Sequence, residues 1–334
     1  MTEAAIAEAE HDGPAAPAAT APTRVAGSVR RITVVDMLRP DGPTGDLLLN
    51  GAGRDTRAGQ VGSAELLGSA TLHVRAGSGP ARTVTRIGAT PDLPALQGLV
   101  GCAASSGFRR AAAAAVPGEL ARRSVLYRLL DDVPVTALIS GYALVANQRP
   151  VRFGHARIAE MIDLCAGYQA DGVMQWIDRQ GWVPTVYGPK TPAVVTDDAW
   201  PDLADLPPNA MRRHRLLDVA RVADGTVRVY AWFRDVFQRP DGERTIVHEY
   251  EIDATIDPAT ATVLEIVATP RVLPWRECPQ AAASAERLRG TSLANVREDV
   301  RAGFVGRSTC THLNDQLRSL ADVVELAQAC GPPS

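Results

Sequence analysis

Apolar and polar residues alternate along two separate parts of the chain, and each of these parts ends in a stretch with helical spacing. Alternation with a period of two is typical of half-buried strands, whereas apolar residues three and four positions apart indicate helices. The first part predicts strands and then a helical region, at 30–36, 46–54, 70–74, 83–88 and 107–145. Pro117 and Pro134 are expected to break that helical region. The last part predicts four more strands and three helices, at 212–219, 226–237, 245–257, 260–269, 280–289, 293–304 and 308–330.

The two parts also match each other in sequence over several ordered blocks. Arg30-Arg31 corresponds to Arg212-Arg213, and Ala89-Thr90-Pro91 corresponds to Ala268-Thr269-Pro270. Blocks that recur in the same order indicate an internal repeat. The predicted fold class is therefore α+β, with two related units that each pack an antiparallel sheet against helices, arranged as a pseudo-twofold internal duplication.

Four segments follow from this arrangement. Residues 1–27 are rich in Ala, Pro, Glu and Thr without periodicity, and are expected to form a disordered tail. Residues 28–148 make up the first unit and residues 209–330 the second. Between them, residues 149–208 begin with helical spacing and continue as a Pro- and Gly-rich stretch that contains several aromatic residues. This stretch is predicted to be either a lid or a structural wrap.

The composition argues against several classes of partner. The 334 residues carry a net charge of −3 and no sustained run of Lys and Arg, so neither nucleic acid nor an anionic membrane is expected. The five cysteines form no CxxC pair, and the sequence contains neither a signal peptide nor a run of about 18 apolar residues. We therefore expect a soluble cytoplasmic protein whose partner is a small molecule, and a homo-oligomer is compatible with this interpretation.

One stretch near the C-terminus concentrates reactive side chains, because Cys310, His312 and Asp315 lie within six residues of one another. With Ser308 or Thr309 as the N-cap, His312 is predicted to lie in the first turn of a helix. The helix N-terminus is expected to lower the pKa of Cys310 and to keep His312 neutral. Asp315 follows His312 by about one turn, where its carboxylate would fix the imidazole tautomer.

A second histidine lies on a predicted strand. His248 shares its face of the strand with Tyr250 and with the apolar residues Ile252 and Ile256. A histidine on such a core face is a hydrogen-bonded core residue, a general base or a metal ligand. If Cys310 is a nucleophile, His248 is a better partner for it than a histidine two positions along the same helix.

Several arginines are candidates for binding a substrate anion through paired hydrogen bonds. The candidates are Arg234, Arg271 and Arg276, together with Tyr250 on the strand of His248. The alternative for each arginine is an ion pair at the surface or at an interface.

Four nitrogen and sulfur donors, Cys278, Cys310, His248 and His312, are of the types that suit tetrahedral zinc. Their spacing does not resemble a zinc finger and no HExxH occurs, so only the fold would bring them together. The sequence also lacks the glycine-rich patterns of nucleotide-binding loops. The expected cofactor is therefore none, or zinc.

The two units differ at the positions of the candidate chemistry. Leu126 takes the place of Cys310 in the first unit, and Arg128 takes the place of His312. We therefore expect chemistry in the second unit only, with the first unit closing the site or supplying a wall to it.

These residues resemble a known family. His248-Glu249-Tyr250-Glu251-Ile252, Cys278-Pro279 and Cys310-Thr311-His312-Leu313 are similar to the pattern of DUF2889, a bacterial family catalogued as a domain of unknown function. The resemblance covers roughly residues 212–329, and Thr309 stands where the family's signature has a glycine. The family brings no established reaction, so the resemblance implies positions to test rather than a substrate.

The residues themselves predict a small-molecule catabolic enzyme without a redox cofactor, such as a lyase, isomerase or hydrolase of an aromatic or acyl substrate. In this hypothesis His248 and His312 perform acid/base work, Cys310 and Asp315 tune them, and an arginine binds a substrate anion. The alternative is a non-catalytic accessory or ligand-binding protein, in which the same residues bind zinc or brace the core.

Overall fold

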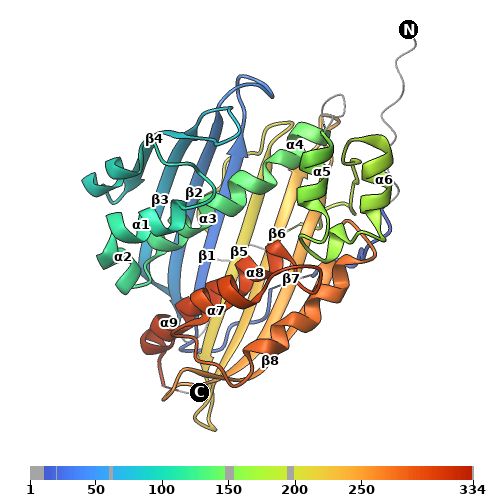
Figure 1. Cartoon of the computed structure of the whole chain (residues 1–334). Helices are drawn as coiled ribbons and strands as arrows, with labels where there is room; N and C mark the ends of the chain where they lie inside the picture. The colour runs from blue at the N-terminus through green and yellow to red at the C-terminus, as the bar shows by residue number, and fades with distance from the viewer. Residues whose placement is uncertain (1–10, 20, 60–62, 147–153, 194–198, 333–334) are drawn as a thin grey trace.

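The predicted strands all belong to one antiparallel sheet of eight strands (Figure 1). The structure is a computed structural model, and it describes residues 11–19, 21–59, 63–146, 154–193 and 199–332. The strand order is β4-β3-β2-β1-β5-β6-β7-β8, so each half of the chain contributes a meander of four neighbouring strands. The strands are β1 (Val29–Leu38), β2 (Leu47–Ala58), β3 (Ala64–Ala76), β4 (Val84–Thr90), β5 (Met211–Arg221), β6 (Val227–Gln238), β7 (Arg244–Asp257) and β8 (Thr262–Val272).

The two halves meet where β1 and β5 pair in antiparallel register at the centre of the sheet. Arg30 lies opposite Asp218 and Arg212 lies opposite Asp36, and each arginine binds its aspartate through two hydrogen bonds. The prediction of a separate sheet in each unit is therefore corrected to one shared sheet. An unpaired edge strand exposes a row of N–H and C=O groups, and joining the meanders satisfies both inner edges.

Helices cover one face of the sheet, which we call the helical face, and the opposite face is called the far face (Figure 1). The helices of the first half are η1 (Pro94–Leu99), α1 (Phe108–Ala115), α2 (Pro117–Ala121), α3 (Val125–Ile139) and α4 (Gly141–Ala146). Those of the central segment are α5 (His155–Met161), η2 (Ala166–Tyr168) and α6 (Val173–Gln180). Those that follow β8 are η3 (Cys278–Leu288), α7 (Val296–Gly303), α8 (Thr311–Ser319), η4 (Leu320–Asp322) and α9 (Val323–Ala329).

The longest helix, α3, packs closely on β1, β2 and β3. Glycine in β2 makes this approach possible, because a Cβ atom at Gly53 would lie 2.7 Å from Cγ1 of Val125. Pro134, which the sequence predicts to be a break, lies inside the helix. Because nearly every residue of α3 is buried, tertiary packing outweighs the cost of the missing backbone hydrogen bond.

Two of the helices predicted near the C-terminus differ in detail from the structure. The segment predicted at 280–289 is the 3₁₀ helix η3, and the segment predicted at 308–330 is divided into α8, η4 and α9. Periodic apolar residues do not distinguish one long helix from short helices that bend around a core.

The N-terminal segment crosses the far face of the sheet. The backbone N–H of Ala16 donates to the carbonyl of Arg271 on β8, and Arg234 donates to the carbonyl of Ala18. Further along, Arg24 donates to the carbonyl of Thr56 on β2. The expected disordered tail is thus corrected for residues 11–19 and 21–27, which hydrogen bonds tie to the sheet; residues 1–10 and 20 lie outside the described residues.

The stretch after α6, which we call the wrap, packs against the sheet. Tyr187 stacks on Phe237 and its hydroxyl donates to the carbonyl of Ala146, which holds the stretch beside β6. Further along, Trp200 packs on the far face with Trp232. The aromatic residues of this stretch therefore fix it around the sheet.

Within the described residues, one helical stretch, Val125–Ala146, is long and apolar enough to cross a membrane. It is mostly buried in the protein, which is typical of a core helix.

Candidate functional site

His248 on β7 and His312 on α8 lie against each other on the helical face. Their rings stack with centroids 3.7 Å apart and planes inclined by 23°. The period-two pattern of β7 turns His248 toward the helices, and the first turn of α8 carries His312 onto it. The structure thus places in direct contact two histidines that are 64 residues apart in sequence.

A buried carboxylate lies beside His248. Oδ2 of Asp235, on the neighbouring strand β6, is 3.4 Å from Nδ1 of His248. Arg213 on β5 donates to both oxygens of the same carboxylate, from Nε at 2.7 Å and from Nη2 at 2.8 Å. Burial acts to raise the pKa of Asp235, but the charge of Arg213 and its hydrogen bonds outweigh that effect, so the pKa lies well below its usual value. Asp235 is therefore a permanent anion next to the His248 ring.

His312 is held in the neutral form. Burial lowers its pKa well below 6.5, and the neighbouring His248 ring adds to the shift. This direction agrees with the expectation for an imidazole at the start of a helix. A neutral imidazole accepts a proton or a hydrogen bond at one ring nitrogen and donates a hydrogen bond from the other, so His312 can act as a base or as a hydrogen-bond donor.

Cys310 differs from its prediction in two ways. It is itself the N-cap of α8, in place of Ser308 or Thr309. Burial raises the pKa of its thiol, although the nearby backbone amides of Leu313 and His312 act in the opposite direction. Its Sγ lies 3.8 Å from Nδ1 of His312. Cys310 is therefore a buried, protonated thiol in contact with the histidine, not an ionised nucleophile.

Asp315 does not orient His312, as the sequence suggested. Its carboxylate instead accepts hydrogen bonds from Arg213, Arg215 and Arg109. Burial acts to raise the pKa of Asp315, but these arginines lower it to about 2. Because Arg109 belongs to α1, the first half of the chain contributes directly to the support of the site.

These ion pairs belong to a larger buried cluster between the helices and the two central strands, which we call the charged seam. It consists of Arg31, Asp55, Arg109, Arg128, Asp131, Asp132, Arg213, Arg215, Asp235, Arg297, Asp315, Arg318 and Asp322. Buried charges are costly unless they are paired in this way. Asp235 is the member of the seam that lies beside His248.

The arginines predicted to bind a substrate lie elsewhere. Arg234 is buried on the far face in an ion pair with Glu249, and Arg271 pairs with Glu251 on the same face. Arg276 is exposed beside Glu277. Arg234 and Arg271 occupy strand positions that point away from the helices, and Arg276 follows β8. None of the three therefore lies beside the two histidines. Tyr250 does face the helices, where its buried hydroxyl donates to the carbonyl of Cys278.

The four donors considered for zinc do not form a metal site. No group of three or more His, Cys, Asp and Glu side chains in the described part of the chain is arranged to hold a metal ion. The nearly parallel rings of His248 and His312 explain this, because the lone pairs of stacked imidazoles lie in parallel planes and do not converge on one ion.

Arg213 and Asp235 are the site residues that the sequence did not single out. A signal for Asp235 exists in the hairpin between β6 and β7. Counting back from a turn at Asp241-Gly242 pairs Asp235 with His248. The structure reaches this pair differently, because Gln238 pairs with Arg244 near the turn and a register irregularity next to Asp235 restores the counted partner. Arg213 lies opposite Asp235 on the next strand, so the same counting extends to it.

Comparisons with known proteins bear on the second half of the chain. No curated protein and no solved structure gives a significant match. Residues 211–325, which contain β5 to β8 and both histidines, match the model of the family described as protein of unknown function (DUF2889), which confirms the resemblance over the last third of the chain.

Proposed function

We propose that the protein is a small-molecule enzyme that works by histidine acid/base chemistry without a redox cofactor. The contact between His248 and His312, with Asp235 beside His248, is the observation that carries the proposal. The reaction classes that need only proton transfer are those of lyases, isomerases and hydrolases, and an aromatic or acyl compound is the proposed substrate.

Separate roles are proposed for the two histidines. His248 is the general base, because the anionic Asp235 beside Nδ1 would hold the imidazole in one orientation. His312 is the hydrogen-bond donor to the substrate, since its low pKa keeps the imidazole neutral with one ring N–H to donate. Two like rings in contact cannot both be charged at low cost, so a proton taken up by His248 keeps His312 neutral.

The support beneath the histidines also has a proposed role. Arg213 holds Asp235 by two hydrogen bonds and is itself held by Asp315. Arg215 and Arg109 fix Asp315 in turn. A network of buried pairs of this kind holds a carboxylate in one position, which supports a preorganised base.

We further propose that the chain is an internal duplication in which only the second copy kept the chemistry. The pairs Arg31–Asp55 and Arg213–Asp235 have the same geometry in the two halves, and a register irregularity follows each aspartate. Opposite Asp55, however, lies Gly68, where the second half has a histidine opposite Asp235. The first half then serves as the built-in partner of the second.

A proton-exchange assay tests the catalytic proposal on many candidate substrates at once. A panel of aryl and acyl carboxylic acids, esters and hydroxy acids is incubated with the protein in D₂O, and NMR follows both loss of C–H signals and new products. Turnover of at least one compound is expected. The folded variants His312→Ala and His248→Ala are expected to lose roughly 100-fold or more of that rate, the usual contribution of a general acid or base.

The control is Glu286→Gln, which alters an exposed ion pair away from the histidines and is expected to leave the rate unchanged. Turnover that survives both histidine substitutions would contradict the proposal. So would the absence of turnover across the panel together with a His248→Ala variant that is merely less stable, a result that favours the non-catalytic alternative.

A further inference from the structure

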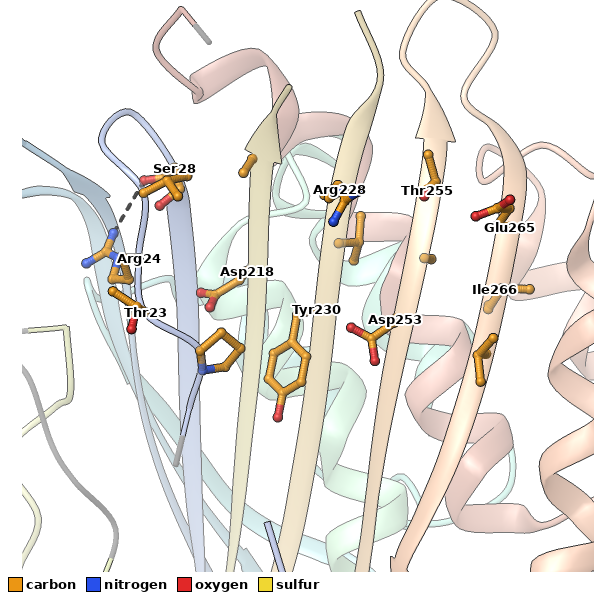
Figure 2. A pocket seen from close by; sticks show the side chains of 16 residues that line it. Thr23, Arg24, Ser28, Asp218, Arg228, Tyr230, Asp253, Thr255, Glu265 and Ile266 are labelled. Carbon is orange, nitrogen blue, oxygen red and sulfur yellow. Dashed lines mark hydrogen bonds between the residues drawn. The ribbon is translucent and has the colours of Figure 1, made fainter. Parts of the chain in front are cut away.

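We propose that the far face of β5 to β8 carries a binding site for a small zwitterion of the amino-acid type. The site is a cavity of about 500 Å³, a volume within the range of small-molecule pockets. The four strands form its floor and the N-terminal segment at 22–25 forms one wall (Figure 2). It lies on the opposite face of the sheet from the histidine pair, so the inference does not rest on the proposed function.

Two rows of side chains cross the floor of this cavity. One row runs in register over the four strands as Asp218, Tyr230, Asp253 and Val267. The next row consists of Ala220, Arg228, Thr255 and Glu265. Figure 2 shows the labelled members of both rows side by side on the same face. Because diagonal neighbours in a sheet are roughly 7 Å apart, Asp253 is within reach of a ligand that also touches Arg228 or Glu265.

Two polar groups of the first row already have partners inside the protein. Asp218 accepts two hydrogen bonds from Arg30 on β1. The hydroxyl of Tyr230 donates to Glu251 at 2.6 Å. These residues shape the floor, and their charges are largely satisfied.

Three charged groups that line the cavity have no such partner. Arg228, Asp253 and Glu265 form no hydrogen bond or ion pair with any residue in the described ranges. Burial and the nearby Glu251 act to raise the pKa of Asp253 and outweigh the opposite effect of Arg271 and Arg228, so a cation placed in contact with this carboxylate would gain from the interaction.

The signs of these charges define the ligand. An ammonium group fits between Asp253 and Glu265, which are diagonal neighbours, whereas the guanidinium of Arg228 offers paired donors to a carboxylate. A simple amine would meet the unpaired Arg228, and a simple carboxylate would meet two unpaired carboxylates. A molecule that carries both groups a few ångströms apart satisfies all three side chains.

The cavity also has an apolar part for the rest of the ligand. Val267 is 61% exposed at the edge of the floor and Val25 is 47% exposed on the wall. Large aliphatic side chains left open to solvent beside unpaired charges form a surface that an apolar side chain of the ligand would cover. We therefore expect apolar amino acids to bind better than small polar ones.

Ligand-observed NMR on the full-length protein tests the site, with the twenty amino acids as probes at millimolar concentration and calorimetry for those that bind. At least one apolar amino acid is expected to bind. Asp253→Asn and Arg228→Gln are each expected to weaken its binding roughly tenfold, the effect of losing one charged contact. Both positions are on the surface of the sheet, so the variants should fold, which circular dichroism verifies.

The matched controls are Glu286→Gln and Arg289→Gln, an exposed ion pair outside the cavity, and binding should be unchanged in both. Putrescine and butyrate serve as the singly signed probes and are expected to bind more weakly than the zwitterion. The proposal is overturned if no amino acid binds, if putrescine or butyrate binds better, or if the two floor variants bind as well as the controls.

Discussion

His214 and His312 are both held neutral by burial. His214 lies on the far face between Trp200 and Trp232, and burial together with nearby arginines lowers its pKa to about 3. Burial and the contact with His248 lower the pKa of His312 well below 6.5. In the unfolded chain both side chains titrate near 6.5, so below that pH the unfolded state binds more protons than the folded state.

The free energy of unfolding is therefore expected to decrease as the pH falls below about 6.5, and these two groups contribute no slope above it. Replacing His214→Phe keeps an aromatic ring beside Trp232 but removes one of the titrating groups, so part of the slope should disappear. Denaturant titrations at several pH values measure this. The exposed Leu138→Ala variant, which changes no titrating group, is the control and should keep the full slope. A His214→Phe protein with an unaltered slope would contradict the assignment.

Asp235 is expected to be among the most sensitive positions of the molecule. Both Asp235 and Arg213 are fully buried, so Asp235→Asn removes the carboxylate that binds two nitrogens of the guanidinium and leaves Asp315, which Arg215 and Arg109 also share, as its remaining counter-charge. Breaking a buried pair in this way costs roughly 3–5 kcal/mol of unfolding free energy. The exposed pair Arg289–Glu286 provides the comparison, since Glu286→Gln should cost less than about 1 kcal/mol. Equal losses in the two variants, measured by denaturant unfolding, would show that the seam pair is not stabilising.

The pair of histidines could be inferred from the sequence, but their charged partners could not be inferred from local patterns. His248 stands out because it is a polar residue on the apolar face of its strand. His312 stands out because it lies in the first turn of its helix, next to the capping residues. Arg234 and Asp235 are adjacent, yet the period of two sends Arg234 to the far face and Asp235 to His248. The register of a hairpin, rather than residue type, decides which of the two takes part in the site.

At the level of secondary structure, the start of α8 determines the chemistry of Cys310. As the N-cap it is 6% exposed, and burial raises the pKa of its thiol. Cys278 is buried as well and its pKa is raised for the same reason. Cys102 lies in the first half and is partly exposed. Reaction with a thiol reagent requires both access and a thiolate.

We therefore expect Cys102 to be labelled much faster than Cys310 and Cys278 in the native protein near pH 8. Mass spectrometry after short exposure to iodoacetamide identifies the labelled positions, and a denatured sample provides the reference in which all cysteines react. Rapid native labelling of Cys310 would mean that the helix N-terminus outweighs burial and that Cys310 is an activated nucleophile after all.

The strands could be predicted more closely than the helices, for a physical reason. A strand in a meander is defined by alternation over a few residues and by turns such as Pro240-Asp241-Gly242, all of which are local. Helix α3 passes through Pro134, and residues 11–19 and 21–27 are ordered by the far face of the sheet. The continuation of α3 through Pro134 and the ordering of the N-terminal segment both depend on contacts with residues that are distant in sequence. Local propensity and composition carry no information about such contacts.

At the scale of the whole molecule, the shared sheet and the charged seam join the two halves. Asp315 of α8 is held by Arg109 of α1, and Arg31 of β1 pairs with Asp322 near the C-terminus. Neither half can separate without breaking the β1–β5 ladder and exposing these buried charges. The chain should therefore unfold as one cooperative unit, although its length would be compatible with two domains.

The distribution of tryptophan makes this cooperativity measurable. All five tryptophans lie after residue 175, so their fluorescence reports on the wrap and the second half, whereas far-ultraviolet circular dichroism reports on the whole chain. The two probes should give the same denaturation midpoint. Leu129→Ala in α3, a 1% exposed position in the first half, should lower the stability by roughly 2–5 kcal/mol and shift both midpoints together. The exposed Leu138→Ala provides the control and should shift neither. If Leu129→Ala lowers only the dichroism midpoint, the halves unfold independently, and the first half cannot be the fixed partner that the proposed site requires.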